Sequence, residues 1–154
     1  MFDYFVAALT CPQCGTVSPA TSITNMQTHI RGGGADGSEL PVGTLLKPTY
    51  LTAKHLYGAG YALITQPPTE GPIRLLDVWT CPECETEQWA AVEVAETRID
   101  RIEGVLLNRA TLEGANFISD ADAELLAESL PGLLHPEPGG RKLGSVEILR
   151  LRLE

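Results

Sequence analysis

CPQCG at residues 11–15, repeated as CPECE at residues 81–85, decides how this chain folds. Two cysteines separated by two residues on a tight turn can direct both sulfurs at one ion. Proline after the first cysteine presets φ for that turn, and glycine after the second tolerates the left-handed backbone that completes it. Two such turns predict a closed site in which four thiolates bind one metal ion. The predicted ligands are Cys11, Cys14, Cys81 and Cys84, which are all the cysteines of the chain.

Zn²⁺ is the metal that this pattern favours, as one structural ion per chain, because zinc in structural sites takes four soft ligands in a tetrahedron. Iron would use the same four thiolates and is the less favoured metal, since the long, acidic chain does not suit a minimal electron carrier. A redox-active disulfide is a third interpretation. It requires the second cysteine to open a helix, which Gly15 and Pro19 oppose. Four free thiols without a metal are the fourth.

The paired turns resemble those of zinc-ribbon and rubredoxin-like proteins, in which the tips of two β-hairpins hold one metal ion. The resemblance covers residues 4–30 and 73–95, where the cysteine pairs and their flanking segments lie. Two features depart from the family pattern. The 66 residues between Cys14 and Cys81 exceed the usual spacing, so residues 31–72 are expected to be an insertion or an extra sheet. Glu85 stands where glycine is usual, so some strain is expected in the second turn.

The hydrophobic pattern predicts an α+β fold in a single domain over residues 1–154. Residues 1–107 are expected to form an antiparallel β region that carries the zinc-ribbon-like tip, and residues 108–154 one or two helices and a terminal strand. Strands are predicted at 2–10, 16–30, 41–46, 73–80, 88–95, 99–107 and 149–154, with a bulge or bend at Gly104. Loops are predicted at 31–38 and 66–72. Helices are predicted at 119–130 and 109–117, and residues 49–57 fit either a helix or part of a hairpin that turns at 58–60.

The charge distribution limits the classes of partner. The net charge is −9; residues 1–80 carry five acids and four bases, whereas residues 81–154 carry fifteen acids and seven bases. An acidic surface repels phosphate backbones, so the charge disfavours nucleic acid as a partner. No apolar run approaches the ~20 residues that cross a bilayer, and all cysteines fall in metal-ligand pairs, so we expect a cytoplasmic protein without a membrane segment.

No catalytic motif accompanies the cysteines. His29, His55 and His135 are scattered along the sequence, and no cysteine remains to act with them as a nucleophile. The sequence therefore favours a non-catalytic zinc-binding protein that acts as an interaction, adaptor or accessory module for an unidentified protein partner. A nucleic-acid-associated zinc ribbon is the first alternative, and an enzyme with an unrecognised site is the second. The oligomeric state is not predicted.

Overall fold

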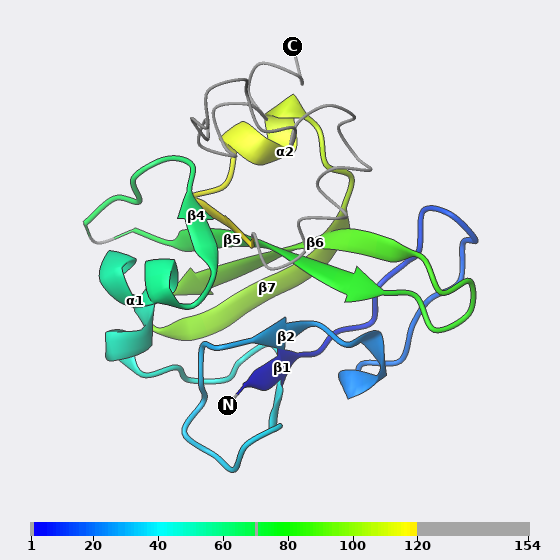
Figure 1. Cartoon of the computed structure of the whole chain (residues 1–154), viewed down its shortest axis with the longest axis horizontal. Helices are drawn as coiled ribbons and strands as arrows, with labels where there is room; N and C mark the ends of the chain where they lie inside the picture. Colours follow the sequence, from blue (N-terminus) through cyan, green and yellow to red (C-terminus); the bar gives the residue numbers. More distant parts are fainter. Residues whose placement is uncertain (1, 70, 120–154) are drawn as a thin grey trace, which may run out of the picture.

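The structure is a computed structural model that describes residues 2–69 and 71–119. A five-stranded sheet in the order β4-β8-β5-β6-β7 lies at its centre, and a three-stranded sheet in the order β2-β1-β3 lies beside it (Figure 1). The large sheet contains β4 (Tyr61–Leu63), β5 (Ile73–Thr80), β6 (Glu87–Ala95), β7 (Arg98–Val105) and β8 (Phe117–Ser119). The small sheet contains β1 (Asp3–Phe5), β2 (Gln27–Thr28) and β3 (Glu39–Leu40). The helical elements are η1 (Ser22–Thr24), η2 (Pro48–Leu51), α1 (Ala53–Gly58) and α2 (Arg109–Glu113).

Strands β5, β6 and β7 form a continuous antiparallel meander. The strands predicted at 73–80, 88–95 and 99–107 match them to within one or two residues. Between β6 and β7, Glu96 and Thr97 both have positive φ, as the two-residue turns that suit twisted hairpins require. The ladder is irregular between Glu93 and Val94. The bulge predicted at Gly104 was therefore wrong, because Gly104 pairs regularly with Ala90.

Both faces of the large sheet are buried, which explains the high apolar content of its strands. One face packs Leu75 and Trp79 into a core with residues of the small sheet, such as Phe5. The opposite face packs Leu76 and Trp89 against residues of α2 and the segment after it. Figure 1 shows α2 and the small sheet on opposite sides of the large sheet. The alternation of strand side chains supplies both cores from the same strands.

The large sheet is mixed, whereas a purely antiparallel sheet was predicted. β8 runs parallel to β5 and antiparallel to β4, and β3 runs parallel to β1. β8 begins at Phe117, the last residue of the helix predicted at 109–117, and only the start of that region, α2, is helical. The β8 residues Phe117, Ile118 and Ser119 are all buried; Phe117 belongs to the core on one face of the sheet and Ile118 to the core on the other.

Residues 31–72 do not form a separate insertion. β3 completes the small sheet, and β4 joins the edge of the large sheet. The strand predicted at 41–46 was wrong: this segment is not a regular strand, although an isolated bridge between Leu45 and Arg98 and three backbone hydrogen bonds join it to residues 97–99. The strand predicted at 16–30 is replaced largely by η1 and the short β2. Loop 31–38 is observed as predicted, and α1 settles the ambiguity at 49–57 in favour of a helix.

The buried carboxylate of Asp3 explains how the glycine-rich loop is held. It accepts hydrogen bonds from the backbone N–H groups of Gly32 and Ser38 at 3.0 and 3.1 Å. The guanidinium Nε of Arg31 lies 3.1 Å from the same carboxylate. One side chain of β1 therefore fixes both ends of the loop.

The helix predicted at 119–130 and the strand predicted at 149–154 lie almost wholly outside the described residues. Ser119, the first residue of that predicted helix, is the last residue of β8. Among the residues that the structure describes, no helix is long and apolar enough to span a bilayer.

A buried polar chain connects the two sheets. The Tyr61 hydroxyl donates a 2.6 Å hydrogen bond to the Asp77 carboxylate and lies 3.0 Å from the Thr28 hydroxyl. Burial raises the pKa of Asp77 to about 7, and the hydrogen bond from Tyr61 only partly offsets this. The unfolded chain titrates this carboxyl near 3.9. Between these two values the native state binds the additional proton, so this group stabilises the fold most in acid, and its contribution falls as the pH rises to about 7.

We expect this titration to appear in the stability of the wild type but not in that of Asp77→Asn. From pH 5.5 to 8 the wild type should lose about 2 kcal/mol of unfolding free energy relative to the variant. Denaturant titrations at several pH values measure the difference. Asp100→Asn, a change at an exposed position of β7, is the matched control and should keep the wild-type pH dependence. Parallel curves for wild type and Asp77→Asn would contradict the expectation.

Candidate metal centre

Two turns of equivalent backbone geometry present the cysteines. Knuckle 1 (residues 10–17) is closed by a bridge between Thr10 and Val17, and knuckle 2 (residues 80–87) is the tip of the β5–β6 hairpin. In each knuckle the N–H of the first cysteine donates to the carbonyl five residues later, over 2.9 Å. The N–H of the residue after the second cysteine donates back to the carbonyl of the first cysteine, over 2.8 and 2.9 Å. The internal repeat of the sequence is thus also a repeat of structure.

The residue that follows each second cysteine has a left-handed backbone. Gly15 has φ 77°, and Glu85 has φ 59°. A non-glycine residue pays roughly 1–2 kcal/mol in this region. The sequence predicted strain in the second turn, and the positive φ of Glu85 is its source. The hydrogen bond from the N–H of Glu85 to the carbonyl of Cys81 holds the residue in this conformation.

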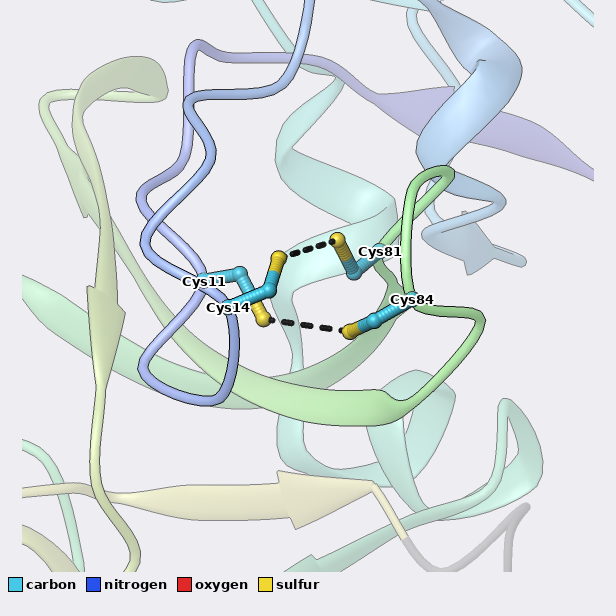
Figure 2. Close-up of side chains that lie close together, drawn as sticks. All are labelled: Cys11, Cys14, Cys81 and Cys84. Carbon is cyan, nitrogen blue, oxygen red and sulfur yellow. Dashed lines mark hydrogen bonds between the residues drawn. The ribbon is translucent and has the colours of Figure 1, made fainter.

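The two knuckles face each other, and their four sulfurs lie together (Figure 2). The Sγ atoms of Cys11 and Cys84 are 3.6 Å apart, as are those of Cys14 and Cys81. All four ligand atoms lie within 4.8 Å of one another. Each short contact joins one knuckle to the other, so the cluster ties residues about 70 positions apart in the sequence.

The cluster lies at the edge of the core. Cys11 and Cys81 are buried, Cys84 is half-buried and Cys14 is exposed. Cys11 and Cys81 belong to the same apolar core as Trp79, whose indole N–H donates to the carbonyl of Trp89 at 3.1 Å. Trp79 and Trp89 therefore pack in the protein interior beside knuckle 2.

The electrostatics of the four thiols differ although they are neighbours. Burial raises the pKa of Cys11, but hydrogen bonds from its own turn and from neighbouring side chains outweigh burial and lower the pKa to about 6. Hydrogen bonds from the side chain and the backbone of Thr16 lower the pKa of Cys14. At Cys81 the backbone N–H of Cys84 favours the thiolate, but burial and the adjacent thiols raise the pKa to about 11. Some of the thiols thus ionise at the expense of others, because thiolates this close repel one another.

A divalent cation would remove this conflict. It would hold all four sulfurs as thiolates, since thiols that coordinate a metal are deprotonated. Zinc–sulfur bonds of about 2.3 Å in a tetrahedron place the sulfurs about 3.8 Å apart, close to the 3.6 Å of the two shortest contacts. The Thr86 hydroxyl lies 2.9 Å from the sulfur of Cys84 and can donate to it. The donor set therefore fits a metal that prefers four soft ligands.

The histidines take no part in this cluster. His29 and His55 line one surface cavity together with Arg31 and Lys54, and His135 lies outside the described residues. The sequence did not indicate that these four residues come together. Nothing in their spacing shows that β2 and α1 are neighbours.

Comparison of the chain with protein-family models, with curated proteins and with solved structures finds no match. The likeness to zinc ribbons therefore stands on the four clustered cysteines, and no wider family assignment supports it.

We expect Glu85→Gly to stabilise the protein by about 0.5–1 kcal/mol, because glycine adopts the left-handed backbone without the steric cost. Chemical denaturation of metal-loaded protein measures this change. Glu83→Gly is the matched control: it removes the same charge from the same knuckle, but its φ is not positive, so it should be neutral or destabilising. Equal gains from both variants would show that charge, and not backbone strain, is responsible.

Proposed function

We propose that the chain is a non-catalytic zinc protein, in which Cys11, Cys14, Cys81 and Cys84 bind one structural Zn²⁺ and the surrounding sheet serves as an interaction or adaptor module for another protein. The observation that carries the metal part is the convergence of four sulfurs within 4.8 Å from two separate turns. Zinc suits this donor set because it forms closed tetrahedral thiolate sites in structural roles. Iron is the less favoured occupant.

The position of the cluster supports a structural role. Knuckle 1 lies between β1 and β2 of the small sheet, and knuckle 2 joins two strands of the large sheet. An ion between the knuckles would clamp the two sheets together. Binding free energy at such a site becomes folding free energy, on the order of 10 kcal/mol, when the empty site is disordered.

The same geometry disfavours metal-assisted catalysis. Catalytic zinc has three protein ligands and an open position for water or substrate, whereas four thiolates complete the tetrahedron. The described residues also contain no other cluster of three or more metal-ligating side chains of this kind. The module proposed here would therefore act by binding.

A protein partner is favoured over nucleic acid by the charge around the centre. Glu83 and Glu85 are exposed on knuckle 2, next to a cluster that would carry a net charge of −2 with zinc bound. Both features repel phosphate. Residues 43–46 already bond to the start of the β7 edge, as far as Ile99. Beyond Ile99 this edge of the large sheet offers backbone groups to which an extended segment of a partner could add.

We expect purified wild-type protein to contain about one zinc atom per chain, and Cys11→Ser and Cys84→Ser to lose it and unfold more readily. Elemental analysis and thermal denaturation measure both effects. Thr86→Val is the matched control, because it removes the hydroxyl beside Cys84 and keeps all four sulfurs. A metal content of the wild type below about one third of an atom, our allowance for loss from a tight site, would contradict the proposal. Iron in place of zinc would contradict the choice of metal.

We expect no binding of mixed-sequence DNA or RNA, even at low ionic strength, because the protein is acidic. Electrophoretic mobility shift assays test this directly. Binding that weakens as salt is raised would contradict the adaptor proposal and favour the nucleic-acid-associated alternative.

Recovery of one stoichiometric protein partner by the tagged wild type, with none recovered by Cys11→Ser, would support the adaptor proposal.

A further inference from the structure

We propose that the cavity beside α1 binds a small organic phosphate made of a planar ring and a phosphate group, of about the size of a nucleoside monophosphate. The cavity has a volume of about 690 Å³ and lies between the segment after β2, η2 and α1. This volume is within the range of roughly 300–1,000 Å³ found for sites of small organic ligands. None of the residues that line it belongs to a knuckle, so the proposed site is separate from the metal centre.

The charge of the lining indicates an anion. Arg31 and Lys54 line the cavity with two histidines, and no aspartate or glutamate lines it. This is unusual on a chain whose net charge is −9. Lys54 forms no ion pair within residues 2–69 and 71–119. Arg31 already pairs with Asp3 and lies near Asp36, so Lys54 carries the positive charge that remains uncompensated. The planar set of N–H donors of an arginine still suits the oxygens of a phosphate group.

Arg31 is held in position before any ligand arrives. Its Nε lies 3.1 Å from the buried carboxylate of Asp3, and its side chain is only 12% exposed. Its Nη2 donates to the carbonyl of Gly34 at 3.2 Å. The Nη1 group lies 3.9 Å from Asp36, too far for a hydrogen bond. The N–H groups of Nη1 therefore remain available to a ligand. Because the guanidinium is already ordered, binding does not incur the entropy cost of ordering it. Asp3 neutralises the charge of Arg31. The uncompensated positive charge of the cavity therefore comes from Lys54.

Two aromatic side chains line the cavity, and they are the reason why the proposed ligand contains a planar ring. The rings of Tyr50 and His55 meet edge to face, with their centroids 4.6 Å apart, and both line the cavity. The His55 Nε2 atom is shielded from solvent and has no hydrogen-bond partner among the described residues. Buried polar nitrogens are usually paired, and a polar atom of the ligand would pair Nε2 only if the imidazole ring turned toward the cavity.

Isothermal titration of the full-length, metal-loaded protein tests the proposal with three probes: adenosine monophosphate, adenosine and inorganic phosphate. We expect adenosine monophosphate to bind at least about tenfold more tightly than either fragment, since it alone engages both the aromatic side chains and the cations. Equal affinity for inorganic phosphate would overturn the role of the ring. Equal affinity for adenosine would overturn the role of the charge. No heat of binding for adenosine monophosphate at millimolar concentration would overturn the site.

Two lysine variants make the test specific. Lys54→Gln should weaken the binding of adenosine monophosphate about tenfold, because it removes a charged contact at an exposed position where folding is not at risk. Lys47→Gln changes a second exposed lysine that does not line the cavity, and it should alter the affinity less than about twofold. Equal losses in both variants would indicate unspecific attraction and would overturn the assigned site. Circular dichroism of both variants confirms that the fold is intact.

Discussion

The convergence of four sulfurs is the constraint on which the rest of the structure depends. Knuckle 1 and knuckle 2 share few residues with the two apolar cores, yet they fix where the small sheet meets the large one. The distance between Cys11 and Cys84, 3.6 Å between their sulfurs, closes a loop of more than 70 residues. Closing a long loop is costly in conformational entropy, and a cation bound by the four thiolates, as proposed above, would offset that cost.

Buried polar groups provide the second level of organisation. Asp3 fixes the glycine-rich loop through Gly32 and Ser38, and the chain from Thr28 through Tyr61 to Asp77 joins the small sheet to the large one. Such groups are costly to bury without partners, so they specify one relative placement of the elements. The apolar cores alone would tolerate several.

The sequence predicted what depends on local chemistry. The cysteine spacing located the cluster, and the strand patterns of 73–80 and 88–95 located β5 and β6 closely. The sequence did not predict the structure of segments whose conformation depends on residues far away in the chain. Phe117 and Ile118 form a strand because β4 and β5 flank them, and no pattern within 109–119 reveals those neighbours. The turn at Glu96 and Thr97 also lacks the glycine or asparagine that usually marks a two-residue hairpin.

The place of β8 in the sheet has a consequence for how the chain is built during synthesis. Among the described strands β4 bonds only to β8, so the residues near position 62 have no sheet partner until those near position 118 have left the ribosome. The meander of β5, β6 and β7 needs only neighbouring segments, and contacts between neighbours form fastest. During translation β4 is therefore synthesised well before β8, and its backbone groups stay unpaired until β8 is available.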